Sequence, residues 1–583
     1  MMKVTRDSTA TEDNTRNGVK PWFGSRAMLV WAAFAMAGAL GLQHAPFLDD
    51  PFFSDDYRFL DRARTTALPA LFGYDDLAYG YWRPWSRGLH FWTLERTFGA
   101  TPLPFHLASL ALATAALTLF FAYARRWIGS ARALAAVYGV VALAAWDLPI
   151  RWPSAAQDLW AIALGLASLV AFTRGRTALA CVALVPALLS KETAAVIPAI
   201  ALAHGLVIER RSFRAALVRV APLGAVVAAW ALVHPALGGR WLHAATAAPL
   251  RAYQDPVRAI VRSVLATVNL DALPQGTAET FDAFKLGLFP ALFVIWMAWR
   301  LTSVRTAEAA PVTATATAPR RVALLGACWA ALAWLPLALP SLIWQPYYVL
   351  LGALGCWLAL AALLPRGVLI ALIAAVALLR APRLETHVDE WGDAKLHARG
   401  RQFMARTERF LRATHPDPPP ATRMFFGAVP RGMVFVLGPG DAPALDVWYQ
   451  RPVPGSFWQD YHVRTANQPS GPDYFFTHDS TTGWREVAQG DEPADTTRHA
   501  SPTWGPDHER LAITLTEAGA PRAASVEYAK LASVFPARAD YAYLAGLTAE
   551  TAGDAALATR WYREAAQRPG ADERMRARAE RAR

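Results

Sequence analysis

Long apolar runs separated by short polar breaks fill roughly the first 380 residues. A bilayer crossing takes about 20 mostly apolar residues, so these runs predict transmembrane helices. No small-residue cleavage site follows the first run, so we expect an uncleaved helix rather than a signal peptide. The pattern predicts a polytopic α-helical membrane protein with about eleven spans, at residues 27–43, 103–124, 133–149, 157–173, 177–189, 194–208, 220–237, 284–299, 322–340, 347–364 and 367–380.

Basic clusters fall in alternate connections between these runs, as orientation signals do. They are Arg125-Arg126 with Arg132, Arg174 with Arg176, Arg210-Arg211 with Arg214 and Arg219, Arg300 with Arg305, Arg320-Arg321, and Arg366. The positive-inside rule then places the N-terminus in the cytoplasm. Residues 44–102 and 238–283 become large outer loops, and an odd number of spans puts the C-terminal region outside as well. We therefore expect a bacterial-type cytoplasmic (inner) membrane protein whose C-terminal domain is periplasmic or extracellular.

The chain divides into four predicted parts. Residues 1–24 read as a disordered cytoplasmic tail, and residues 25–380 form the transmembrane domain. Residues 381–504 predict an outer soluble α/β module, in which MFFGAV and MVFVLG read as short buried strands. Residues 505–583 predict helical repeats. The cytoplasmic connection 300–321 reads as a flexible low-complexity linker.

The repeat rests on a fixed spacing. Leu511-Ala512, Gly519, Tyr528 and Pro536 recur as Leu544-Ala545, Gly553, Tyr562 and Pro569, offset by 33 or 34 residues. That period, with two helices and a closing proline per unit, resembles the tetratricopeptide repeat. Two visible units predict a docking role, so a protein partner through residues 505–583 is possible.

Within the outer loop 238–283, the stretch RAYQDPVRAIVRSVLATVNL places apolar residues at helical spacing, with Arg251, Arg258 and Arg262 on the other face. Two interpretations stay open: a helix in the membrane interface, or a helix of a soluble loop.

Composition supports the membrane assignment and excludes other classes. The 583 residues are 54% hydrophobic and only 18% charged, below the quarter that is typical of soluble domains. The net charge of +12 is spread between apolar runs, so we expect no nucleic-acid partner. Cys181, Cys328 and Cys356 all lie in apolar runs without a CxxC or Cys/His pattern, so we expect no zinc site, disulfide framework or cofactor.

Candidate chemistry concentrates between Phe53 and His106 in the first outer loop. Asp55 and Asp56, in SDDY, can take the proton of an attacking hydroxyl or amine, which makes them the candidate catalytic acids. A carboxylate here can instead hold a divalent cation on a lipid phosphate, so a metal stays open. The same residues also suit the first turn of a helix. We considered Asp49-Asp50 and Asp75-Asp76 as weaker alternatives.

Arg83 and Arg87, in YWRPWSRGLHFW, are four residues apart and would share one side of a helix that begins at Pro84. A guanidinium binds phosphate bidentately, so both are candidates for a donor phosphate. An anchor that reaches the lipid headgroups is the alternative.

Five further polar residues fall on the predicted outer face. His106 opens the second span, and Arg151 and Asp158 flank the start of the fourth. Lys191 and Glu192 form the third outer turn, LLSKETAAVIP. An ionisable group at the end of an apolar helix is costly unless it faces a protein cavity. We assign Lys191 to the donor phosphate, and His106, Arg151, Asp158 and Glu192 to substrate binding.

Taken in order, SDDY, YWRPWSRGLHF, TPLPFHLASLAL, the acidic residue at the fourth span, LLSKETAAVIP and WQPYYVLLG resemble the GT-C superfamily. These are polytopic glycosyltransferases that use polyprenyl-phosphate-linked sugars. The likeness is to the protein O-mannosyltransferase-like and aminoarabinose-transferase-like branch, which includes proteins with C-terminal tetratricopeptide repeats. It covers about residues 27–365 and implies a GT-C-like fold, an inverting transfer, Asp55 or Asp56 as catalytic base, and Arg83 and Lys191 at the lipid phosphate.

The predicted function is a membrane glycosyltransferase that moves a sugar from a polyprenyl-phosphate donor to an acceptor at the outer, periplasmic face. Its partners would be that lipid-linked sugar and membrane lipid. The main alternative is a non-catalytic membrane assembly protein that acts through its repeats. A transporter would show Gly/Pro-broken spans in matching halves, and none is clear.

Overall fold

The computed structural model describes residues 25–74, 77, 81–235, 254–272, 277–303, 319–339, 342–385, 394–427, 429, 442–457, 464, 469–487 and 504–582. The predicted N-terminal tail, most of the 300–321 linker, Asp75-Asp76, Arg251 and the predicted strand MVFVLG lie outside the described residues. The chain folds into two compact units, Met1–Asp50 with Thr66–His397, and Pro51–Thr65 with Ala398–Arg583. Part of the predicted first outer loop, Pro51–Thr65, thus groups with the C-terminal region.

The described residues of the first unit form helices and connecting turns. Its longer helices are α1 (Ser25–His44), α3 (His90–Phe98), α4 (Pro102–Val141), α6 (Ala156–Thr173), α7 (Thr177–Leu188), α8 (Ile197–Val207), α9 (Phe213–Val233), α11 (Pro256–Ala266), α12 (Thr277–Ser303), α13 (Pro319–Trp334), α14 (Leu350–Leu363) and α15 (Arg366–Leu384). Short helical turns join them: η1 (Ala45–Phe47), η2 (Leu68–Phe72), η4 (Pro84–Leu89), η5 (Ala144–Trp146), α5 (Asp147–Arg151), η6 (Pro153–Ala155), η7 (Glu192–Val196), η8 (Leu335–Ala338) and η9 (Pro346–Val349).

Seven stretches of helix among the described residues are long and apolar enough to cross a membrane: Ala27–Phe47, Pro102–Val141, Pro153–Thr173, Phe213–Val233, Pro319–Ala338, Pro346–Leu363 and Arg366–Leu384. Three shorter apolar helices are Thr177–Leu188, Glu192–Val207 and Gly287–Arg300. The mostly helical, multi-span architecture agrees with the sequence prediction. The number of eleven spans is not confirmed.

The break between the second and third predicted spans, 103–124 and 133–149, falls inside the predicted connection. Both lie along α4, which bends at Gly129 (φ 74°, ψ 164°). Gly129 adopts a positive φ at little cost because it has no Cβ, so one glycine within residues 125–132 is enough to break the helix. The helix then ends at Val141, short of the predicted boundary, and turns η5 and α5 follow.

Large apolar side chains stay exposed on the outer helices of this unit. Examples are Trp31 (63%) and Phe34 (69%) on α1, Val218 (68%) and Leu232 (67%) on α9, and Phe289 (67%) on α12. A soluble protein rarely exposes so much apolar surface, whereas lipid tails match it. These faces are therefore the membrane-contacting surface.

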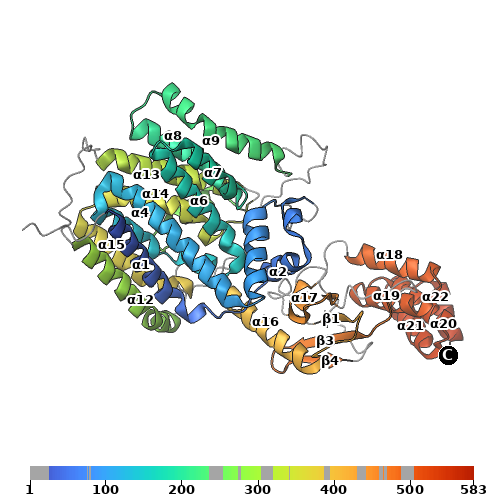
Figure 1. Ribbon diagram of the computed structural model, residues 1–583. Helices are drawn as coiled ribbons and strands as arrows, with labels where there is room; N and C mark the ends of the chain where they lie inside the picture. Colours follow the sequence, from blue (N-terminus) through green and yellow to red (C-terminus); the bar gives the residue numbers. More distant parts are fainter. Residues whose placement is uncertain are drawn as a thin grey trace, which may run out of the picture. The chain divides into compact units, whose positions relative to one another are not determined.

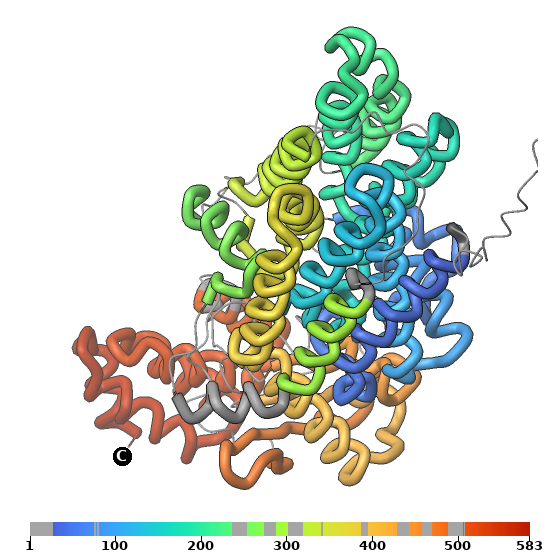
Figure 2. The backbone as a smooth tube through the Cα atoms, turned by 90° about the vertical axis from the view of Figure 1, so that its left-hand side faces the viewer, coloured from blue at the N-terminus to red at the C-terminus, as the bar shows by residue number. Residues whose placement is uncertain are grey.

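The helix α4 lies at the centre of the unit and packs against α1, α6, α12 and α14 (Figure 1). α13 and α14 lie side by side (Figures 1 and 2), and their backbones touch where Gly326 meets Gly355. The indoles of Trp329 and Trp334 donate to the carbonyls of Leu351 (2.9 Å) and Val349 (3.1 Å). These bonds hold the turn η9 and the N-terminal end of α14, which follows it, against α13.

The predicted loop helix in 251–270 is present as α11, capped by the Asp255 carboxylate, which accepts from the Val257 amide (2.7 Å). Its Arg262 guanidinium stacks on Trp344 (4.0 Å), and Trp344 donates to Ser263 (2.9 Å). The helix is thus held on the protein by polar and aromatic contacts. That α11 lies in the membrane interface stays a prediction.

The second unit contains a small four-stranded sheet with α2 (Asp55–Thr65), α16 (Ala394–Thr414, from Ala398 onward) and α17 (Pro443–Tyr449). The strands are β1 (Arg423–Gly427), β2 (Gly455–Phe457), β3 (Asp473–Asp479) and β4 (Gly483–Val487), in the order β2-β1-β3-β4. β1 is parallel to β2 and β3, and β4 is antiparallel to β3. The predicted strand MFFGAV is confirmed by β1, whose residues are all buried.

The unit ends in five helices that pack in chain order: α18 (Trp504–Glu517), α19 (Pro521–Val534), α20 (Ala539–Thr551), α21 (Ala555–Gln567) and α22 (Glu573–Arg581) (Figure 1). Gly519 after α18 and Gly553 after α20 both have positive φ (71° and 81°), which only glycine adopts without cost. The helix pairs thus recur at the predicted spacing. The tetratricopeptide assignment itself stays a prediction.

A side chain at Gly355 should separate α13 from α14. Its Cβ would lie 2.6 Å from the Gly326 carbonyl and 2.8 Å from the Ala330 amide, and backbone cannot yield as a side chain can. We expect Gly355→Ala to lower the stability of the purified protein by about 1–3 kcal/mol. Gly224→Ala in α9, where nothing lies within 4 Å, is the control and should be neutral or slightly stabilising. Equal thermal melts in detergent would contradict the close approach.

Candidate functional site

Arg83 occupies the centre of a buried polar cluster in the first unit. Its Nε lies 3.0 Å from both carboxylate oxygens of Glu192, and its Nη2 also bonds that carboxylate. Nη1 donates to the Gln157 Oε1 (2.5 Å), which also accepts from the Arg87 Nε (3.2 Å). Both guanidiniums therefore meet one amide oxygen. We call Arg83, Arg87, Gln157, Asp158, Lys191 and Glu192 the Arg83–Lys191 cluster.

Lys191 is the second buried cation of the cluster. Its ammonium donates to both carboxylate oxygens of Asp158, at 2.6 and 2.7 Å. Two rings of η9 lie beside it, with Nζ 4.2 Å from the Tyr348 centroid and 5.3 Å from that of Tyr347. Lys191 is 6% and Asp158 5% exposed. The charge is held by a carboxylate and by aromatic faces rather than by water.

Three segments that are distant in sequence build this cluster: the turn with Arg83 and Arg87, the start of α6 with Gln157 and Asp158, and the turn with Lys191 and Glu192. The first begins where Pro84 starts η4, a π-helical turn, which is a rare conformation that often occurs at functional sites. The Trp85 amide donates to the Leu189 carbonyl (3.2 Å), and the Ser86 hydroxyl donates to the Ser190 carbonyl (2.9 Å). These bonds hold η4 against the turn that carries Lys191.

The predicted geometry of Arg83 and Arg87 is present. Pro84 starts the helical turn, and both side chains reach the same partner, Gln157. The Tyr81 ring stacks on both guanidiniums, 4.3 Å from the Cζ of Arg83 and 5.5 Å from that of Arg87. Gln157 is held by its own bond to the Ser154 carbonyl (2.8 Å).

Two ion pairs dominate the electrostatics of the cluster: Arg83 with Glu192, and Lys191 with Asp158. Burial alone would lower the pKa of the Arg83 guanidinium, but the Glu192 carboxylate outweighs it and raises that pKa. Burial lowers the pKa of the Lys191 ammonium; Asp158 opposes this shift and Arg83 adds to it. Both cations of these pairs are therefore held in place by a carboxylate.

Arg151 and His106 belong to a neighbouring set of contacts in the same unit. The Arg151 guanidinium binds Asp50 Oδ2 through Nε (3.1 Å) and Nη2 (3.0 Å), and Asp147 Oδ2 through Nη1 (3.3 Å). Burial alone would lower the pKa of Arg151, but Asp147 and Asp50 raise it. The His106 ring lies between the carbonyls of Asp50 (2.9 Å) and Ile150 (3.2 Å). These bonds join the segment after η1, which carries Asp50, to α4 and α5.

Asp55 and Asp56 belong to the second unit, as the first residues of α2. The Asp56 carboxylate is fully buried and accepts from the Phe53 amide (2.9 Å), a helix-capping contact. Ser54 before it adopts a positive φ (54°). The structure therefore places both acids at a helix start, the alternative noted in the sequence. Their catalytic role stays a proposal.

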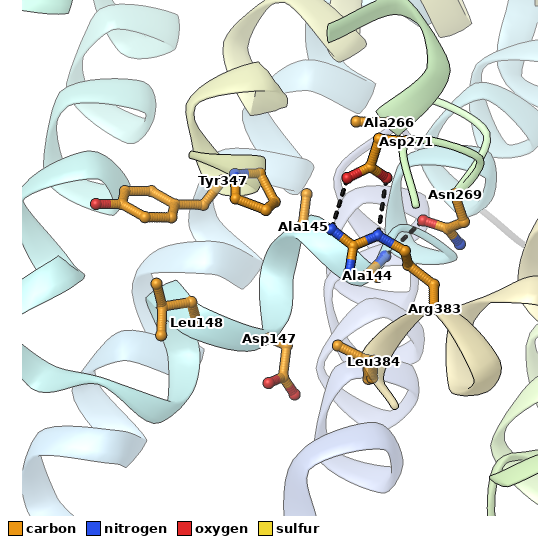
Figure 3. A pocket seen from close by; sticks show the side chains of 11 residues that line it. Ala144, Ala145, Asp147, Leu148, Ala266, Asn269, Asp271, Tyr347, Arg383 and Leu384 are labelled. Atoms are coloured by element: carbon orange, nitrogen blue, oxygen red, sulfur yellow. Dashed lines mark hydrogen bonds and ion pairs between the residues drawn. The ribbon is translucent and has the colours of Figure 1, made fainter. Parts of the chain in front are cut away.

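One cavity of the first unit is lined by residues that the sequence analysis did not select: Ala144, Ala145, Asp147, Leu148, Ala266, Asn269, Asp271, Pro346, Tyr347, Arg383 and Leu384 (Figure 3). The Arg383 guanidinium faces the Asp271 carboxylate across two bonds of 2.9 and 2.5 Å (Figure 3). Asn269 accepts from the Ala144 amide (2.8 Å) and donates to the carbonyls of Ala142 and Val376. These contacts pin the end of α11 to η5 and α15.

Gln157, Tyr348 and the Asp271–Arg383 pair were not assigned roles from sequence. Each acts through a partner far along the chain, and no local spacing reveals such a pairing. The one available signal was position, since all four lie near ends of apolar runs. Within the described residues, no group of three or more His, Cys, Asp or Glu side chains is arranged to hold a metal ion.

No protein-family model matches the chain, and no curated protein matches it. The chain is similar to two crystal structures of ArnT from Cupriavidus metallidurans. The one bound to undecaprenyl phosphate has 15% identity and a TM-score of 0.44, covering 73% of this chain and 86% of that chain. The apo structure has 14% identity and a TM-score of 0.36, covering 74% and 86%. Likeness at this level assigns no residue role to this chain.

Removal of Asp158 should strand a buried charge. We expect Asp158→Ala to lower the stability by about 3–5 kcal/mol, because the buried Lys191 ammonium loses its carboxylate partner. The double variant Asp158→Ala/Lys191→Ala should recover part of the loss, since it removes the stranded charge as well. The measurement is thermal or denaturant unfolding in detergent. Additive losses in the double variant would show that the pair is not coupled.

Proposed function

We propose that this protein is a GT-C-type membrane glycosyltransferase that transfers a sugar from a polyprenyl-phosphate donor to an acceptor at the outer, periplasmic face of the cytoplasmic membrane. The observation that carries the proposal is the Arg83–Lys191 cluster. Buried cations at the ends of apolar helices are costly, and a lipid-linked phosphate is a ligand that would use them. The sequence motifs that resemble the GT-C superfamily include the same residues.

The charge of the cluster suits this ligand. A sugar–phosphate–lipid diester carries one negative charge, which guanidinium and ammonium groups bind through charge-assisted hydrogen bonds. Arg83 and Arg87 offer planar donor forks and Lys191 offers a compact point charge. In this proposal Asp158 and Glu192 hold these cations in place and yield part of their hydrogen bonds to the phosphate. Arg151 and His106 position the adjoining helices.

The proposed chemistry is a displacement at the anomeric carbon. The acceptor hydroxyl or amine forms a bond to that carbon, and the bond from the carbon to the phosphate oxygen breaks. The electron pair leaves with polyprenyl phosphate, whose added charge the cluster stabilises. The acceptor proton passes to Asp55 or Asp56. The helices of residues 505–583 would bind a protein partner, and the N-terminus would face the cytoplasm.

Arg83→Lys tests the phosphate site without stranding Glu192, because the charge is kept while the planar fork is lost. We expect affinity for polyprenyl phosphate to fall by about tenfold, the equivalent of one charged hydrogen bond. Arg96→Lys is the matched control, since Arg96 lies exposed on the adjacent helix α3 and should bind normally. Binding is measured with radiolabelled lipid on protein in nanodiscs. Unchanged affinity in Arg83→Lys would count against the assignment.

Asp55→Asn/Asp56→Asn tests the catalytic acids while preserving the helix start, because asparagine also caps helices. With a panel of radiolabelled polyprenyl-phosphate sugars, wild type should release polyprenyl phosphate. The variant should turn over about 10²- to 10⁴-fold more slowly and still bind the donor. Asp61→Asn in the same helix is the control. If the folded wild-type protein binds no donor, the transferase proposal is wrong and the alternative, a non-catalytic assembly protein, takes its place.

A further inference from the structure

The C-terminal end of α6 is surrounded by arginines from three helices of the first unit. Arg126 of α4 donates to the Thr173 carbonyl (3.5 Å), and Arg219 of α9 donates to the Phe172 carbonyl (3.0 Å). Arg174 itself caps α6. Helix carbonyls attract cations, so capping explains part of this arrangement. It does not explain the excess of positive charge.

That excess is large in sequence and in space. The stretches 125–132, 174–176 and 209–219 contain nine arginines and one acidic residue, Glu209. Glu209 bonds both Arg211 and Arg219, so one carboxylate serves two guanidiniums. Arg126, Arg174 and Arg176 are exposed at the same end. Three positive charges remain when Glu209 is set against Arg126, Arg174, Arg211 and Arg219.

The turn between α6 and α7 adds further donors. Arg174 and Arg176 flank Gly175, whose positive φ (76°) makes the turn tight. α7 begins at Thr177 and is twelve residues long, and no side chain caps its first amides in the described structure. The amides at a helix start favour an anion. Arg174, Arg176 and the first amides of α7 thus lie within one short turn.

Apolar side chains continue from this charged end along the membrane-contacting surface. Leu179 (51%) and Val182 (66%) on α7 and Leu217 (48%) on α9 are exposed, and α7 packs against both α6 and α9 (Figure 1). A ligand that fits has an anionic head and apolar chains. By the charge rule this end of the helices faces the cytoplasm, where the leaflet is anionic.

We propose that the C-terminal end of α6, with Arg126, Arg174 and Arg176, is a binding site for the phosphate headgroup of an anionic phospholipid of the cytoplasmic leaflet. The headgroup lies between these guanidiniums and the first amides of α7. Its chains follow Leu179, Val182 and Leu217. This site is separate from the Arg83–Lys191 cluster, and it does not depend on the proposed transfer reaction.

The test compares lipid retention by native mass spectrometry of the full chain released from nanodiscs with equal phosphatidylglycerol and phosphatidylcholine. Wild type should retain phosphatidylglycerol preferentially. Arg126→Gln/Arg174→Gln should weaken that retention by about 25-fold, because each arginine near a bilayer surface contributes about a factor of five. Phosphatidylcholine retention should not change.

Arg320→Gln/Arg321→Gln is the matched control, since it removes two arginines, one exposed and one half-buried, at the start of α13 on the same predicted membrane side. It should retain phosphatidylglycerol as wild type does. Equal retention by both double variants and wild type, or equal loss in both, would overturn the proposal. Displacement of the lipid by soluble glycerol phosphate would overturn the lipid as ligand. A thermal unfolding curve in lipid-free detergent shows whether Arg126→Gln/Arg174→Gln is folded. If that variant is not folded, Arg126→Lys/Arg174→Lys replaces it and should retain phosphatidylglycerol as wild type does.

Discussion

A cation buried at the end of an apolar helix must be paired, and this constraint organises the first unit. The Lys191 ammonium and the Arg83 guanidinium are each shielded from water, so Asp158 and Glu192 lie within hydrogen-bond distance of them. The pairing fixes more than charge. It requires η4 to lie against the turn at Lys191, and the backbone bond from Trp85 to Leu189 holds that register. The cluster is therefore preorganised before any ligand arrives.

Sequence reasoning could find the helices and the members of the cluster, because both depend on local signals. Apolar runs marked the helices, and charged residues at their ends stood out against them. Arginine placement then put Arg83, Asp158 and Lys191 on one predicted side, and the structure brings them together. The break at Gly129 lies inside the connection predicted between the second and third spans, because the arginines around it marked that connection.

Pairings across long stretches of chain could not be predicted. Gln157 as the shared acceptor of two arginines, and Asp271 with Arg383, depend on which helices pack together. The same holds for α2. Its sequence predicts a helix start at Asp55 and Asp56. The spacing of its apolar residues does not predict that this helix packs against α17 in the second unit. The catalytic proposal for these acids therefore rests on residue type and motif.

The most direct test of the central claim is a cryo-electron microscopy structure of the protein in nanodiscs with polyprenyl phosphate. The proposal predicts phosphate density within hydrogen-bond distance of the Arg83 guanidinium and the Lys191 ammonium, with the prenyl chain leaving between apolar helices. Density for the phosphate at another position, with the Arg83–Glu192 and Lys191–Asp158 pairs unchanged, would contradict it. The cluster would then be a structural ion-pair network, and the transferase proposal would lose its main support.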